Sequence, residues 1–279
     1  MTLWYNLCDA LPLEMLQWDF MKHALLALLI MAPLYGLCST MIVTGRMSFF
    51  SDALGHSAFT GIAIGSICGI AAPTWVAVIF AIIFALLFSF VKSRSHQTAD
   101  TIIGVFSSTA VALGIFIATF GGGSFTKYNR YLIGDILSVT PGEIGLLTLV
   151  LAGVVLFWIM FSNRLTLSVI HPHLASSRGI RVHWMQALFT TAIAVVVTLS
   201  ISWVGLLTLN SLLVLPGASS RNVARNMFQY HLLSVLNAFV AGVVGLCLSY
   251  CFGVSAGASI ALVLAGIFAV SFLFRKVRG

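Results

Sequence analysis

The sequence consists largely of long apolar runs separated by short polar stretches. Of its 279 residues, 60% are hydrophobic and 8% are charged, whereas a soluble globular domain carries about 25% charged residues. A run of about 20 apolar residues can cross the hydrocarbon core of a bilayer as a helix. Open strands cannot satisfy their backbone hydrogen bonds in lipid, so each run is expected to be helical. The pattern therefore predicts an all-α, polytopic membrane helix bundle.

We expect eight or nine transmembrane helices in a single membrane domain that covers residues 1–279. The nine candidate segments are residues 23–43, 54–70, 75–91, 101–120, 144–161, 184–202, 204–215, 232–250 and 257–274. Asp52 and His56 stand at the start of the second, and the seventh has only about twelve apolar residues before Pro216 and Gly217. Short or interrupted segments in matching positions of two halves are typical of a transport site. The second segment also carries Gly61, Gly65 and Gly69, a stripe that allows close helix packing.

The basic residues predict how the chain is oriented. If the nine segments alternate, eleven of the fourteen Lys and Arg residues lie on one side, and Lys22, Lys127 and Arg130 lie on the other. Cytoplasmic loops are enriched in Lys and Arg, so we expect a cytoplasmic C-terminus. Residues 1–19 mix Leu, Trp and acids, which favours a short interfacial helix on the outer face. The net charge of +7 then reflects membrane orientation and lipid contact, and nucleic acid is not an expected partner.

Asp52 and His56 lie four residues apart at the start of the second apolar run, in RMSFFSDALGHSAFTGIAIG. One helical turn places both side chains on the same face. A carboxylate and an imidazole together form a two-ligand site that suits Zn²⁺, Mn²⁺ or Fe²⁺. An ionisable side chain near lipid costs about 2.5–3.5 kcal/mol on insertion scales, so such a pair normally has a function. These two residues are therefore the candidate metal site.

The same pair also has an interpretation without a metal. Asp52 could cap the N-terminus of its helix, and His56 could bond to a loop carbonyl, although Ser51 is an equally good cap. Thr60, one turn further along, could add a polar oxygen to the site or hold a water molecule in the path. The residues alone leave both interpretations open.

The longest loop on the basic side contains the sequence HPHLASSRGI, residues 171–180. This sequence predicts a short amphipathic helix that ends near Gly179 and suits docking into a groove on a partner. His171 and His173 could suggest a metal site, but Pro172 separates them and no acidic residue is close. Docking is therefore the favoured interpretation.

Two absences argue against an enzyme. None of the four lysines follows a glycine, so the sequence has no P-loop that could hold ATP phosphates. The HExxH pattern of a metalloprotease is also missing. We therefore expect no enzymatic activity in this chain.

With these features in place, the chain resembles the permease subunits of the zinc, manganese and iron ABC importer family from about residue 24 to residue 274. The blocks that carry the resemblance are GRMSFFSDALGHSAFTGIAIG, ADTIIGVFSS, YLIGDILSVTPGE, VGLLTLNSLLVLPGASSRNVAR and GVSAGASIALVLAGIF. The resemblance implies the permease fold of type II ABC importers, similar to that of the vitamin-B12 importer. It further implies an ATP-driven importer in a bacterial cytoplasmic (inner) membrane. We expect zinc as its cargo, with manganese or iron as alternatives, and no permanently bound cofactor.

Site residues follow from the same resemblance. The family's D-x-L-x-H block falls on Asp52 and His56, which look like metal ligands in the translocation path. The segment HLASSRGI stands where the family has its coupling helix, which docks on the ATPase. The residues implied in coupling, within a loop of about residues 165–183, are His171, Pro172, His173, Leu174, Ala175, Arg178 and Gly179. The sequence departs from the family at His171, where an Asp commonly precedes the proline.

The resemblance also implies partners: a second copy of the chain, two cytoplasmic ABC ATPase subunits and an external metal-binding protein. That protein would dock on the N-terminal helix and the 121–142 loop. Two Asp–His pairs in a homodimer would supply four ligands, and ATP-driven movement of the coupling helices would produce alternating access. The alternative is a secondary metal–proton antiporter or a metal channel that uses the same pair. Such a protein needs no coupling helix, so purification with an ATPase would distinguish the two.

Overall fold

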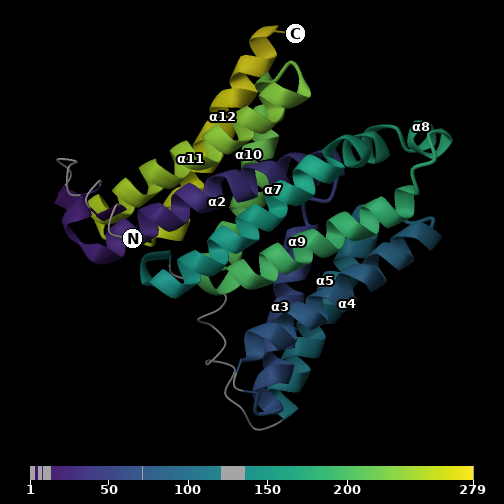
Figure 1. Cartoon of the computed structure of the whole chain (residues 1–279), viewed down its shortest axis with the longest axis horizontal. Coiled ribbons are helices and arrows are strands. Elements are labelled where there is room, and N and C mark those ends of the chain that lie inside the picture. Colours follow the sequence, from purple (N-terminus) through teal and green to yellow (C-terminus); the bar gives the residue numbers. More distant parts are fainter. Residues whose placement is uncertain (1–3, 6–7, 9–13, 71, 121–135, 279) are drawn as a thin grey trace. The chain divides into compact units, whose positions relative to one another are not determined.

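The computed structural model describes residues 4–5, 8, 14–70, 72–120 and 136–278, with side chains described through residue 274. Within these ranges the regular secondary structure is helical (Figure 1), which confirms the all-α prediction. The elements are η1 (Glu14–Gln17), α2 (Asp19–Thr44), α3 (Phe50–Ile67), α4 (Pro73–Arg94), α5 (Ala99–Phe120), η3 (Ile136–Ser138), α7 (Pro141–Ile170), α8 (Pro172–Ser177), α9 (Val182–Val204), α10 (Leu206–Val223), α11 (Met227–Phe252) and α12 (Ala256–Arg278).

Among the described residues, seven helices are long and apolar enough to cross a membrane, namely α2, α4, α5, α7, α9, α11 and α12. α3 and α10 have 18 residues each and are less apolar than these seven helices. These two helices correspond to the second and seventh predicted segments. α3 carries Asp52 and His56, and α10 carries Asn210 and Arg221. These two less apolar helices are thus the ones that the sequence marked as unusual.

The chain divides into two compact units. The first comprises Met1–Thr40, Asp135–Val155 and Ser211–Gly279, and the second comprises Met41–Gly134 and Leu156–Asn210. Three helices, α2, α7 and α10, contribute residues to both units. The single-domain organisation expected from the sequence stays a prediction.

In the second unit, α3 packs against α4, α5 and α9. A Cβ atom on Gly61 would lie 2.4 Å from the Cα atom of Ala77, and one on Gly65 would lie 3.0 Å from the Cα atom of Pro73. The close approach predicted from the glycine stripe is therefore confirmed between α3 and α4. The inclusion of Gly69 was wrong, because this residue lies in the turn after α3 with φ of +67° and open space around it.

In the first unit, α10 continues through Pro216 to Val223, although the sequence predicted a segment that ends before this proline. Proline removes one backbone donor and crowds the preceding turn. The Ser39 hydroxyl on α2 accepts the Gly217 N–H at 2.8 Å and donates to the Val214 carbonyl at 3.3 Å. Glycine permits this approach, because a Cβ atom there would lie 2.7 Å from the Ser39 carbonyl oxygen. The hydroxyl thus binds one backbone group on each side of the proline, and the helix continues through this point.

Two predicted features lie partly outside the described residues. Within residues 1–19 the structure describes residues 4–5, 8 and 14–19, including η1. Within the predicted 121–142 loop it describes η3 and the start of α7. The interfacial helix and the docking loop therefore stay predictions.

Candidate functional site

Asp52 lies in the first turn of α3, where the helix dipole favours a negative charge. The N-cap residue of this fully described helix is Phe49, and no side chain forms a cap hydrogen bond there. The Ser51 hydroxyl donates instead to the carbonyl of Ser48 at 3.3 Å. The capping interpretation of Asp52 and Ser51 is therefore wrong for this structure, and the Asp52 carboxylate is directed elsewhere.

The carboxylate lies between a histidine and an asparagine. His56 Nε2 is 3.5 Å from Asp52 Oδ2, and Asn210 Nδ2 donates to Asp52 Oδ1 at 2.9 Å. The two side chains of α3 thus share one face, as their spacing predicts. The Asp52 side chain is 40% exposed and that of His56 is 27% exposed. The cluster therefore remains accessible while one carboxylate oxygen is held in place.

Asn210 was not identified from the sequence. It lies in the second turn of α10, where an uncharged amide within an apolar run gives only a weak signal. Its Oδ1 atom is buried and has no hydrogen-bond partner among the described residues. A buried polar group without a partner costs about 1–3 kcal/mol. An unpaired buried group calls for an explanation. The amide keeps this unfavourable position while its Nδ2 atom donates to the Asp52 carboxylate, so a role in holding the carboxylate explains why an asparagine stands here.

Thr60 does not belong to the candidate site. Its side chain is fully buried, and its hydroxyl donates to the Ala110 carbonyl of α5 at 2.7 Å. A Cβ atom on Gly114 of α5 would lie 2.7 Å from the same hydroxyl oxygen. The expectation of an additional ligand oxygen was wrong, because close packing of α3 on α5 uses this hydroxyl. Thr60 instead fixes α3 one turn after His56.

Two side chains of this cluster, the Asp52 carboxylate and the His56 imidazole, are strong candidate ligands for a divalent cation. The carboxylate and the imidazole are both good donors for borderline metals, and an amide oxygen is a weaker, neutral donor. No group of three or more His, Cys, Asp or Glu side chains is placed to hold a metal within the part of the chain that the structure describes. A structural zinc site has four protein ligands. The described part of one copy therefore supplies two strong candidate ligands, fewer than a structural zinc site uses.

The predicted short helix is present as α8, which covers Pro172–Ser177 between α7 and α9 (Figure 1). Pro172 begins the helix, where its missing N–H is not needed. The helix ends in a Schellman arrangement, in which Ile180 N–H donates to the Ala175 carbonyl at 3.0 Å. Gly179 adopts φ of +75° there, a conformation that favours glycine. The sequence thus determines both ends of α8.

Most of α8 is exposed. Among the seven residues predicted to couple the chain to a partner, Ala175 is buried, and the others are exposed: His171, Pro172, His173, Leu174, Arg178 and Gly179. The predicted loop of residues 165–183 is shorter than expected, because α7 continues to Ile170 and ends just before Pro172. Leu174 is 46% exposed, so α8 presents an apolar side chain at the surface.

With seven long apolar helices among its described residues, this chain is a multi-pass membrane protein. It belongs to the ABC 3 transport family, whose model matches residues 17–275. The family resemblance deduced from the sequence is confirmed.

Relatives and a solved structure match the chain over nearly its whole length. The manganese transport system membrane protein MntC of Listeria monocytogenes is 26% identical over 265 residues, which are 95% of this chain and 94% of that protein. The high-affinity zinc uptake system membrane protein ZnuB of Haemophilus influenzae is 27% identical over 254 residues, which are 90% and 94% of the two chains. The structure of PsaBC from Streptococcus pneumoniae in complex with Fab matches with a TM-score of 0.80 and 27% identity, covering 98% of this chain and 95% of the other.

Proposed function

We propose that this chain is the transmembrane permease subunit of an ATP-driven importer of a divalent transition-metal cation. The observation that carries the proposal is the contact of Asp52 with both His56 and Asn210, which joins the two polar helices α3 and α10. Polar side chains on short membrane helices are typical of transport sites. The relatives that are named for manganese or zinc transport support this function.

The proposed fold is one permease domain of the type II importer kind, with eight or nine membrane helices. The seven apolar helices together with α3 and α10 would give nine membrane helices. The proposed location is a bacterial inner membrane, with the C-terminus in the cytoplasm. The excess of Lys and Arg on one side of the alternating segments supports this orientation.

In the proposed mechanism the metal ion is the cargo, and it binds the Asp52 carboxylate and the His56 imidazole. Asn210 holds one carboxylate oxygen through its N–H, so that the second oxygen remains directed toward the histidine. Zinc is the expected cargo because imidazole suits it and because affinity for such ligands is higher for Zn²⁺ than for Mn²⁺. Manganese and iron suit the same ligand set and remain the alternatives.

A homodimer would complete the ligand set. Two copies contribute two Asp52 carboxylates and two His56 imidazoles, so that four strong ligands and two negative charges meet one divalent cation. This number matches the coordination preferred by zinc. One copy has no third strong ligand near the pair within its described residues, which supports the need for a second.

Energy would come from separate ATPase subunits that dock on α8. Its exposed Leu174 offers an apolar contact, and the Schellman end at Gly179 keeps the short helix rigid. An external metal-binding protein would deliver the cation on the opposite face. Movement of α8 by the ATPase would then change the access of the cation site from outside to inside.

The test is transport in proteoliposomes that contain this chain, its ATPase subunits and the external binding protein. We expect uptake of Zn²⁺ or Mn²⁺ that needs ATP hydrolysis and is absent with an ATPase variant that binds ATP without hydrolysing it. A proton gradient alone should produce no uptake. Metal uptake driven by a proton gradient in vesicles without the ATPase would contradict the proposal and support the antiporter.

A further inference from the structure

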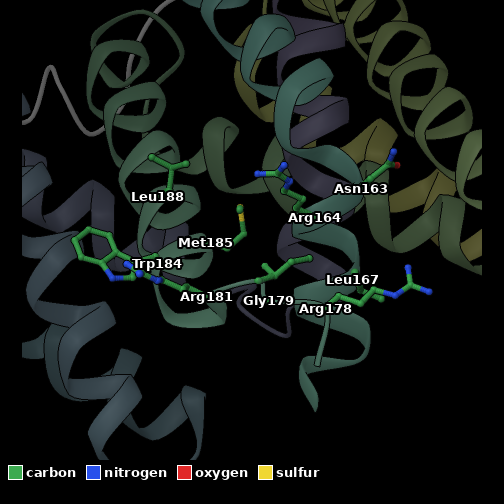
Figure 2. Close-up of a pocket in the computed structure, with 10 residues that line it drawn as sticks. Asn163, Arg164, Leu167, Arg178, Gly179, Arg181, Trp184, Met185 and Leu188 are labelled. Carbon is green, nitrogen blue, oxygen red and sulfur yellow. The ribbon is translucent and has the colours of Figure 1, made fainter. Parts of the chain in front are cut away.

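An open cleft of about 660 Å³ lies between the end of α7 and the start of α9, next to the segment that follows α8 (Figure 2). Three arginines line it: one from α7 and two from the segment between α8 and α9. Aromatic and apolar side chains of α9 line the opposite side. The residues that matter here are Arg164, Arg178, Arg181, Trp184, Met185 and Leu188.

The three arginines have no acidic partner in the described structure. The sequence contains no Asp or Glu from residue 144 to residue 279. The ion pairs found among the described residues join Asp19 to Lys22 and Asp52 to His56. Three guanidinium groups around one cleft therefore carry a positive charge that the surrounding helices do not neutralise.

The cleft also has an apolar side. Trp184 is 72% exposed and Leu188 is 42% exposed, whereas Met185 is buried and forms part of the lining. Figure 2 shows Arg164 extending into the space between α7 and α9, whereas the Arg178 side chain lies at the edge of the cleft and extends away from this space. Cationic and apolar surfaces thus face the same space.

Both helices that form the cleft are apolar enough to cross a membrane. Arg164 lies near the end of α7, and Trp184 lies in the first turn of α9, so the cleft lies where two membrane helices reach water. Tryptophan is enriched at this level of the bilayer. Basic pockets between membrane helices on the cytoplasmic side are typical binding places for anionic lipid headgroups.

We propose that this cleft binds the phosphate-bearing headgroup of an anionic phospholipid. Guanidinium groups form paired hydrogen bonds with phosphate oxygens, and the exposed Trp184 and Leu188 offer an apolar surface to the adjoining acyl chain. The volume falls within the range of about 300–1,000 Å³ that is usual for small-molecule pockets. A concave cleft of this size suits a headgroup better than the broad surface of a partner protein, for which α8 supplies the protruding element.

The test uses the full chain purified with its ATPase subunits, and native mass spectrometry counts the lipids that remain bound. Phosphatidylglycerol is titrated against phosphatidylcholine. The variant combines Arg164→Gln with Arg181→Gln and leaves Arg178 unchanged, since that residue belongs to the predicted coupling set. The control combines Arg221→Gln with Arg225→Gln, which removes the same charge outside the cleft.

The wild type and the control should retain phosphatidylglycerol in preference to phosphatidylcholine. Each arginine near an anionic lipid contributes about fivefold to affinity, so the cleft variant should bind about 30-fold more weakly. Equal phosphatidylglycerol binding by the cleft variant and the control would overturn the proposal. Unchanged lipid binding with loss of the ATPase would also overturn it, because the cleft would then be a protein-docking surface.

Two further measurements complete the test. In the first, inorganic phosphate is titrated alone. If the two arginines affected the binding of free phosphate but not the binding of lipid, the proposal would be overturned. Trp184→Phe keeps every charge, so it remains informative if the double variant does not fold. Brominated phosphatidylglycerol should quench less tryptophan fluorescence in Trp184→Phe than in the wild type, and equal quenching would contradict a lipid beside this indole.

Discussion

Replacing Asn210 with leucine would test whether its amide positions the carboxylate of the cation site. The substitution removes the 2.9 Å hydrogen bond to Asp52 Oδ1, and a bond to a charged group typically contributes about 1.5–3 kcal/mol. Water can replace part of this bond, because the Asp52 side chain is 40% exposed. The substitution also removes the buried Oδ1 atom that lacks a partner among the described residues, which relieves about 1–3 kcal/mol. The free energy of unfolding should therefore change by less than about 1 kcal/mol.

The effect of Asn210→Leu on transport should be much larger. Residues that orient a metal ligand typically contribute about 10–100-fold to affinity or activity. Metal uptake at limiting Zn²⁺ or Mn²⁺ should therefore fall by about tenfold or more, while the unfolding midpoint in detergent remains close to that of the wild type. The matched control is Asn237→Leu, which removes a 3.1 Å hydrogen bond between the Asn237 amide and Ser220 and should keep normal uptake. The positioning role would be refuted if Asn210→Leu showed wild-type uptake. It would also be refuted if uptake fell no further than the amount of folded protein.

Three other substitutions test the packing and the docking helix. Ser39→Ala should lower the free energy of unfolding by about 1–3 kcal/mol, because the buried Gly217 N–H loses its acceptor; an unchanged denaturation midpoint would contradict this. Gly61→Ala should destabilise by about 1–3 kcal/mol through overpacking against α4, whereas Gly104→Ala on the open side of α5 should be neutral or stabilise by up to about 1 kcal/mol. Equal midpoints for these two glycine variants would argue against close packing of α3. Leu174→Asp should weaken binding of the ATPase by about 30-fold, as expected for loss of a 2 kcal/mol contact, and normal co-purification would argue against docking on α8.

Local sequence patterns were sufficient to predict the helices and the shared face of Asp52 and His56. Residues one turn apart on a helix meet because of its period, whatever the rest of the fold does. The end of α8 near Gly179 was predictable for the same reason, since glycine favours the backbone conformation found there. These features depend on interactions over a few residues.

Features that depend on distant residues were not predictable. Asn210 lies 158 residues from Asp52 in the sequence, and an asparagine in an apolar run shows no sign of its partner. Pro216 indicated the end of a segment, but α10 continues through it, and the Ser39 hydroxyl of α2 binds backbone groups on both sides of the proline. Thr60 lies on the turn after His56, yet α5 takes its hydroxyl. In each case a contact from another helix decides the role of the side chain.

The central claim is that Asp52 and His56 bind the transported metal. The most direct measurement is uptake of Zn²⁺ and Mn²⁺, followed separately, in cells that carry the complete transporter with the intact chain, Asp52→Ala or His56→Ala, with membrane expression measured for each. We predict that both variants reach the membrane at normal levels and lose uptake of the transported ion. Normal uptake of both ions by both variants would contradict the account and place the cation path elsewhere in the chain.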